Sequence, residues 1–136
     1  MQPSKDCLLD TGVANLIARN DPVALQRLAI YNNVLVPDIV IGELYYGAYH
    51  YAAVHHSPRL LNLYDNLRNR HRGQLIHANE DTAIIYGAIA ADLRSKGQLI
   101  QQNDMWIAAL ARQYQLRLLT LDSDYQRVIG LDLDVW

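Results

Sequence analysis

Cysteine and long apolar runs are nearly absent from this sequence. Its 136 residues contain one cysteine, and no stretch approaches the roughly 18 apolar residues that a membrane helix needs. Cys7 cannot form an internal disulfide, which favours a reducing compartment. Residues 1–6 also lack the apolar core of a secretory signal. We therefore expect a cytoplasmic protein that does not bind a membrane.

Positive charge is scarce as well. Twelve basic and 14 acidic residues give a net charge of −2, which argues against a protein held to nucleic acid by bulk positive charge alone. The glycine signatures GxGxxG and GxxxxGKS/T are missing, so the usual dinucleotide and P-loop sites are excluded. The five histidines show no HExxH motif or paired Cys/His spacing, so we expect no zinc site. No serine or cysteine has the setting of a catalytic nucleophile.

Short apolar segments alternate with segments of helical periodicity along the chain. Five apolar runs are typical of buried strands: residues 7–9, 34–36, 73–77, 118–120 and 131–135. Six other segments have helical patterns: residues 13–17, 22–30, 39–51, 58–70, 79–96 and 103–114. Strands that alternate with helices form a parallel sheet covered on both faces. We expect one α/β domain over residues 1–136, with a central parallel sheet of four or five strands flanked by helices.

Acidic residues follow several of the predicted strands. Asp10 comes directly after the first strand, Asp38 and Glu43 follow the second, and Asp122 and Asp124 follow the fourth. Ligands of an open parallel sheet bind beyond the carboxyl ends of its strands. Three strands therefore deliver acids to the same edge, which a random scatter of solubilising charges would not favour.

Glu43 and Asp104 lie on helix faces that are expected to point toward the protein. Glu43 shares its face with Ile39, Val40 and Gly47, and Asp104 lies on a similarly apolar stripe. A carboxylate removed from water must be paired, hydrogen-bonded or bound to a metal. Neither acid has a cation three or four positions away in its helix. A divalent cation is the simplest partner, and ligands that are all oxygen favour Mg²⁺ or Mn²⁺.

Each acid also has an ordinary structural interpretation. Asp10 and Asp38 stand where a helix N-cap is expected, and the same position is predicted for Asn79 and Asn103. Asp104, near the start of its helix, could simply favour the helix dipole. Only the joint pattern of acids favours a functional site over caps and surface charges.

Acids clustered around Mg²⁺ usually act on phosphate esters, because the metal neutralises the phosphate and activates water. A basic group at Arg68, Arg70 and Arg72 could then contact a nucleic-acid backbone. An exposed helix end, where cations complement the dipole, explains these arginines equally well.

Four short motifs, in chain order, resemble those of PIN-domain ribonucleases. They are Leu8-Leu9-Asp10-Thr11, Ile41-Gly42-Glu43-Leu44, Asn103-Asp104-Met105-Trp106 and Leu119-Thr120-Leu121-Asp122-Ser123-Asp124-Tyr125. More narrowly, the chain resembles the toxin component of VapBC toxin–antitoxin pairs, and residues 128–136 resemble the end of that group. The likeness covers essentially the whole chain.

The resemblance implies a PIN-like three-layer fold and an endoribonuclease that depends on Mg²⁺ or Mn²⁺. Such a toxin of a type II toxin–antitoxin system cleaves RNA with a metal-activated water and blocks translation. The family's acidic quartet falls on Asp10, Glu43, Asp104 and Asp122, with Asp10 and Asp104 as the principal metal ligands. Asp124 competes with Asp122 for the fourth position.

The resemblance also implies polar support around the acids and two kinds of protein partner. Thr11, Thr120 and Ser123 are the supporting candidates, whereas Gly12 stands where the family often has Asn or Ser. The partners are a second copy of the chain and a VapB-type antitoxin. Its tail is expected to cross the helices that contain residues 45–51 and 58–70 and to place a basic side chain among the acids.

Three other functions start from an aspartate at a strand end. A phosphate-accepting receiver domain needs a lysine late in the chain, but the only lysines are Lys5 and Lys96. A haloacid-dehalogenase phosphatase needs a second aspartate where this chain has Gly12. A non-catalytic PIN-like module that binds RNA or protein stays open, although the complete acidic quartet argues against it.

Overall fold

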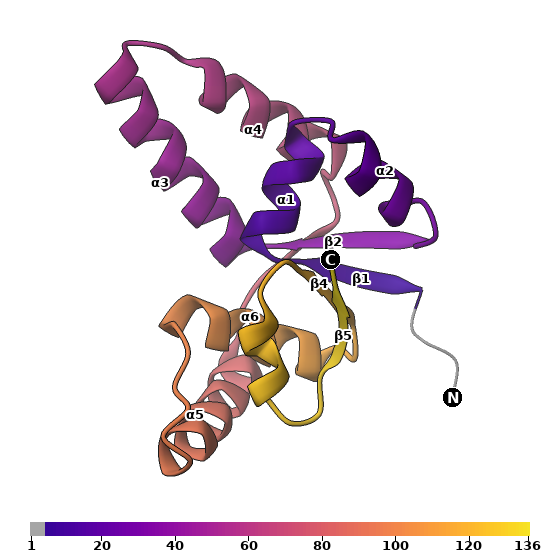
Figure 1. Ribbon diagram of the computed structural model, residues 1–136, viewed down its shortest axis with the longest axis vertical. Helices are drawn as coiled ribbons and strands as arrows, with labels where there is room; N and C mark the ends of the chain where they lie inside the picture. Colours follow the sequence, from indigo (N-terminus) through magenta and orange to yellow (C-terminus); the bar gives the residue numbers. More distant parts are fainter. Residues whose placement is uncertain (1–4) are drawn as a thin grey trace.

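Five short strands form one parallel sheet at the centre of the molecule (Figure 1). The computed structural model describes residues 5–136, and residues 1–4, on which the expectation about a secretory signal largely rests, lie outside the described residues. The strands are β1 (Asp6–Leu9), β2 (Asn33–Pro37), β3 (Leu75–Ile76), β4 (Arg117–Thr120) and β5 (Asp132–Val135). Their spatial order is β3-β2-β1-β4-β5, and every neighbouring pair is parallel. The predicted α/β fold is confirmed.

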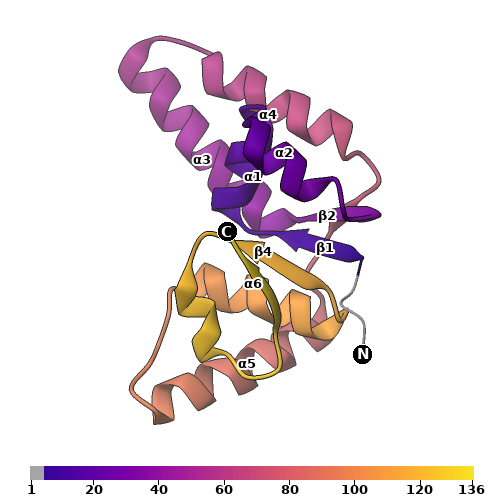
Figure 2. The same ribbon diagram turned by 45° about the vertical axis from the view of Figure 1, so that its right-hand side comes forward.

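Six α-helices within residues 5–136 cover the two faces of the sheet. They are α1 (Thr11–Ala18), α2 (Pro22–Leu28), α3 (Asp38–His55), α4 (Arg59–Arg70), α5 (Glu80–Ser95) and α6 (Gln102–Gln113), and a short 3₁₀ helix, η1, spans Ser123–Arg127. Figures 1 and 2 show α1 to α4 on one side of the sheet and α5 and α6 on the other. In the part of the chain that the structure describes, no helix is long and apolar enough to cross a membrane.

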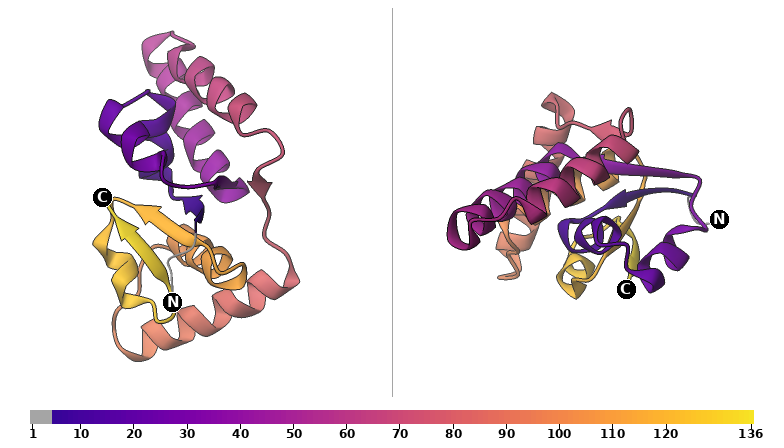
Figure 3. Two further views of the ribbon diagram at one scale, coloured as in Figure 1. Left: turned by 90° about the vertical axis from the view of Figure 1, so that its right-hand side faces the viewer. Right: turned by 90° about the horizontal axis from the view of Figure 1, so that it is seen from above.

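Helices α3 and α4 lie side by side as a hairpin that projects beyond the sheet (Figure 3). The sequence predicts an end of the first helix near residue 51, but α3 continues to His55. It stops at His56, whose positive φ of 50° is a left-handed conformation that ends a helix. The hairpin is therefore longer than the sequence pattern indicates.

Strands β1 and β4, in the middle of the sheet, are buried on both faces, and their pairing positions Asp10. Residues 7–9 of β1 are fully buried, as are Leu118 and Leu119 of β4. Strands with both faces buried are expected to be continuous apolar runs, as these are. The backbone N–H of Asp10 donates to the carbonyl of Leu119 at 3.1 Å, so the pairing of β1 with β4 extends to Asp10.

Two of the predicted helix caps are wrong. Helix α3 begins at Asp38 itself, with Pro37 at the N-cap position and no side-chain cap, because β2 leads directly into the helix. Helix α6 begins one residue before Asn103, which is therefore inside the first turn. The prediction for Asn79 is confirmed: it exchanges hydrogen bonds with Thr82 in a capping box at the start of α5.

Candidate active site

The four predicted acids lie on different elements whose ends meet at one edge of the sheet. Asp10 follows β1 and is the N-cap of α1, and Asp122 follows β4 and is the N-cap of η1. Glu43 lies in the second turn of α3, and Asp104 lies in the first turn of α6. Figure 1 shows the first turns of α1 and α3 together at this edge. One face of the sheet thus contributes α1 and α3 to this place, and the other face contributes α6.

Asp10 is held from both sides and is 6% exposed. One carboxylate oxygen accepts the backbone N–H of Val13 at 3.0 Å, and the other accepts the hydroxyl of Thr120. Burial raises the pKa of Asp10, the two hydrogen bonds oppose that rise, and repulsion from Asp122 and Glu43 adds to it. Asp10 is therefore both a helix cap and a member of the acidic group, so the two interpretations of this residue are compatible.

Glu43 and Asp104 each accept one hydroxyl from another element. Thr11 donates to Glu43 at 2.7 Å and connects α1 to α3, while the phenol of the buried Tyr125 donates to Asp104 at 3.1 Å. Burial raises the pKa of Asp104 to about 6. The hydrogen bond from Tyr125 opposes this rise, and repulsion from the other three acids adds to it. The structure thus brings all four acids within electrostatic reach of one another.

The chemistry of this acidic group fits a divalent cation. Within residues 5–136, none of the four carboxylates forms an ion pair with a lysine, arginine or histidine. In the same range no group of three or more His, Cys, Asp or Glu side chains is arranged to hold a metal ion. Burial raises the pKa of both Asp10 and Asp104, and repulsion between the acids adds to it; a hard cation would balance that negative charge.

The structure distinguishes Asp122 from Asp124. Asp122 is one of the carboxylates that raise the pKa of both Asp10 and Asp104. Its own side chain accepts the backbone N–H of Asp124 at 2.8 Å. Asp124 instead lies 3.3 Å from the guanidinium of Arg127 in an ion pair. Of the two acids, Asp122 is the one directed into the acidic group.

Polar support around the acids matches the sequence analysis in part. Thr11 and Thr120 each contact an acid, and Thr120 also accepts the backbone N–H of Asp122 at 2.9 Å. Ser123 makes no side-chain hydrogen bond in the described part of the chain. Sequence reasoning missed the role of Tyr125, which is 1% exposed and donates to Asp104. Its place at the end of the motif that contains Asp122 was a signal, but the pairing itself joins residues 21 apart.

Gly12, in the first turn of α1, lies close to the side chain of Leu121. A Cβ atom at this position would lie 3.1 Å from Cδ1 of Leu121 and 3.6 Å from Oδ1 of Asp10. The first distance is tighter than ordinary packing, so a larger residue would press Leu121 away from the first turn of α1.

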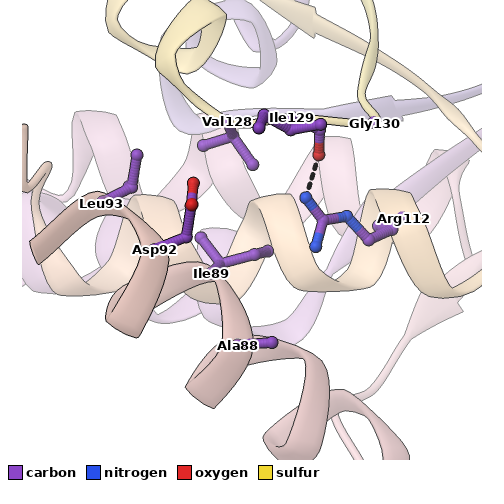
Figure 4. A pocket seen from close by; sticks show the side chains of 8 residues that line it. All are labelled: Ala88, Ile89, Asp92, Leu93, Arg112, Val128, Ile129 and Gly130. Atoms are coloured by element: carbon purple, nitrogen blue, oxygen red, sulfur yellow. Dashed lines mark hydrogen bonds between the residues drawn. The ribbon is translucent and has the colours of Figure 1, made fainter. Parts of the chain in front are cut away.

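Two cavities differ in their relation to the acids. A hollow of about 590 Å³ is lined by Glu43 and by residues of α3 and α6. A cavity of about 270 Å³ lies between α5 and residues 128–130 (Figure 4), and none of the four acids lines it. Arg112 lines this second cavity, and its guanidinium donates to the carbonyl of Ile129. Only the first of these cavities adjoins the candidate site.

The stability of the metal-free protein should fall as the pH rises from about 4 to about 6. The pKa of an ordinary aspartate, as in the unfolded chain, is 3.8, whereas the pKa of Asp104 in the folded protein is about 6. The folded state therefore binds this proton more tightly than the unfolded state between these two pH values. The loss should be about 1 kcal/mol, less than full linkage gives, because the carboxyl is only half-buried and is screened by water. Urea unfolding in EDTA at several pH values measures it. An Asp104→Asn variant with the same pH slope as the parent would contradict the assignment.

The comparisons with known proteins identify the class of protein. The PIN domain family matches residues 7–131, and the chain belongs to that family. A search of curated protein sequences finds no match. Solved structures that match over nearly the full length contain VapC toxins of VapBC complexes, which shows a shared fold.

Three of these structures illustrate the similarity. A DNA-bound VapBC from Salmonella typhimurium has a TM-score of 0.82 at 24% identity, covering 96% of this chain and 98% of that chain. VapBC2 from Rickettsia felis, bound to a promoter DNA fragment, has a TM-score of 0.78 at 22% identity, with coverages of 95% and 97%. VapBC-1 from nontypeable Haemophilus influenzae has a TM-score of 0.77 at 25% identity, with coverages of 95% and 96%.

Proposed function

We propose that residues 1–136 form a single PIN domain that acts as a Mg²⁺- or Mn²⁺-dependent endoribonuclease. In this proposal the chain is the toxin of a type II toxin–antitoxin system and blocks translation by cleaving RNA. The observation that carries the proposal is the meeting of four carboxylates at one edge of the sheet, where no cationic side chain among residues 5–136 forms an ion pair with them. Membership of the PIN domain family supports it.

The residues have distinct roles in this proposal. Asp10 and Asp104 hold the ion, and Glu43 and Asp122 complete the negative surface around it. A bound divalent cation would neutralise the scissile phosphate and activate a water for in-line attack. Thr120 fixes the orientation of the Asp10 carboxylate. Tyr125 orients Asp104. Burial raises the pKa of the Tyr125 phenol, so the phenol keeps its proton and donates it to the Asp104 carboxylate in a hydrogen bond.

Cleavage of RNA by the purified chain should require Mg²⁺ or Mn²⁺. Total RNA incubated with the protein should show new internal ends in Mn²⁺ and none in EDTA, with activity restored when Mn²⁺ is added back. Sequencing the RNA ends after expression in a translating extract identifies the cut sites. RNA that stays intact across a full Mn²⁺ titration would contradict the nuclease proposal and favour a non-catalytic binding module.

We further propose that the chain forms a homodimer and binds a VapB-type antitoxin across α3 and α4. The structural neighbours are toxin–antitoxin complexes, which supports a partner of this kind. The rings of Tyr45 and Tyr49 of α3 pack at a tilt with centroids 6.0 Å apart, and the guanidinium of Arg68 of α4 lies 5.5 Å from the centre of the Tyr45 ring. Aromatic and arginine side chains of this kind are enriched in protein interfaces.

Replacing Tyr45 and Tyr49 with alanine should weaken inhibition by the antitoxin tenfold or more, because both rings would leave the interface. Residual cleavage is measured against antitoxin concentration and normalised to each variant's own rate, which removes any effect on catalysis. Light scattering at high concentration gives the oligomeric state. A monomer whose inhibition is unchanged by both substitutions would contradict this partner proposal.

A further inference from the structure

The hollow beside the acids is built from two helices that approach it from opposite faces of the sheet. Ile39, Gly42, Glu43 and Tyr46 of α3 line it together with Asn103 of α6. Its volume is about 590 Å³. A Cβ atom at Gly42 would meet nothing within 4 Å, so the absence of a side chain there keeps this part of the hollow open. Glu43 belongs to both the hollow and the acidic group, which makes the two continuous.

Tyr46 differs from the other tyrosines of α3. The rings of Tyr45 and Tyr49 pack on each other, and Tyr51 packs on His55. Tyr46 is 78% exposed, and among the described residues neither its ring nor its hydroxyl has a partner. It follows Glu43 by three positions and therefore lies on the same face of the helix. An unused aromatic face thus lies directly beside the candidate site.

Asn103 adds an unused amide to the same hollow. Its side chain is exposed and makes no hydrogen bond within residues 5–136. A carboxamide both donates and accepts, as the edges of nucleobases do. A phosphate in the hollow would be repelled by Glu43, whereas an uncharged flat ring would not. The hollow therefore combines an aromatic face, an amide and a wall that disfavours anions.

We propose that this hollow binds one unpaired RNA base next to the scissile phosphate, with the base stacked on Tyr46 and its edge hydrogen-bonded to Asn103. This inference rests on the proposed ribonuclease function, and it names the form of substrate: single-stranded RNA, because paired bases present neither a free face nor a free edge. Stacking of a base on an aromatic side chain changes affinity by roughly ten- to a hundredfold.

Binding of a fluorescent oligonucleotide tests the proposal. The probes are single-stranded octaribonucleotides that carry 2-aminopurine at successive positions, titrated in Ca²⁺. At one position the parent should quench the fluorophore; Tyr46→Phe should bind similarly, and Tyr46→Ala should bind about tenfold to a hundredfold more weakly. Asn103→Ala should reduce the preference among octamers that differ only at that base. An abasic site there should remove the difference between the parent and Tyr46→Ala.

Two matched controls separate a lost contact from a damaged fold. Tyr114→Ala removes another exposed tyrosine, one at the far end of α6 from Asn103, and should leave binding unchanged. Gly42→Leu should fill the hollow and weaken binding, whereas Gly87→Leu, at an equally open helical glycine of α5, should not. Neither leucine should lower the melting temperature, because leucine favours a helix more than glycine does.

The outcomes distinguish this inference from the proposed function. If the parent binds RNA through Tyr46 but does not cleave it in Mn²⁺, the nuclease proposal fails and base binding stands. If the parent cleaves RNA and Tyr46→Ala binds every octamer as tightly as the parent, base binding is overturned. A Tyr46→Ala variant that loses only antitoxin inhibition would also overturn it and assign the hollow to a protein segment.

Discussion

Replacing Asp104 with asparagine should lower the rate of Mn²⁺-dependent RNA cleavage at least about a thousandfold. The change keeps the shape of the side chain and the acceptor for the Tyr125 phenol, but it removes one of the two charges proposed to hold the ion. Charge stabilisation by a catalytic metal is worth several kcal/mol, and about 4 kcal/mol corresponds to a thousandfold in rate. Single-turnover cleavage of a labelled RNA measures the loss.

A stable inactive variant would support the assignment most strongly. Burial and, to a smaller extent, repulsion from the other three acids raise the pKa of Asp104, so removal of its charge should leave the metal-free protein at least as stable as the parent near pH 7. Asp92→Asn is a suitable control, because Asp92 forms an exposed ion pair with Lys96 on α5. The control should cleave at the parental rate. Equal rates for Asp104→Asn and the parent would contradict a catalytic role.

The edge at which the acids meet could be predicted from the sequence, because it follows from topology. The run before Asp10 is a fully buried strand, and a parallel sheet places the ends of such strands together. The helical phase of Glu43 and Asp104 indicates that both face the protein, and each accepts a hydroxyl from another element. The spacing of apolar residues within one helix is enough to predict which face of that helix is buried, and no contact with a distant residue has to be known.

Thr11 and Thr120 could be named as supporting residues through the family resemblance, but the acid that each contacts could not be predicted, since these contacts join residues far apart in the chain. Thr120 and Asp10 are separated by 110 positions, and their hydrogen bond depends on the pairing of β1 with β4. The incorrect caps have a different cause. Asp38 looks like a cap by composition, but a strand that ends at the preceding proline leaves no turn in which a cap could form.

The choice between Asp122 and Asp124 leads to the second large expected effect. Asp122→Asn should lower cleavage roughly ten- to a hundredfold, and Asp124→Asn should change it less than about twofold. The difference follows from their surroundings: Asp122 contributes to the repulsion around Asp10 and Asp104, whereas the charge of Asp124 is directed to Arg127. A fourth acid that shapes the field around an ion contributes less than a ligand, so about 1–3 kcal/mol is expected.

Asparagine keeps the structural role of Asp122, which makes the comparison between the two positions a matched one. Its amide oxygen can still accept the backbone N–H of Asp124 and so preserve the start of η1. Both variants should therefore unfold at nearly the same urea concentration as the parent. Cleavage rates are then measured at several Mn²⁺ concentrations. If Asp122→Asn binds the ion more weakly, the difference in rate between this variant and the parent should shrink as the Mn²⁺ concentration increases. A larger loss for Asp124→Asn than for Asp122→Asn would reverse the assignment and make Asp124 the fourth acid.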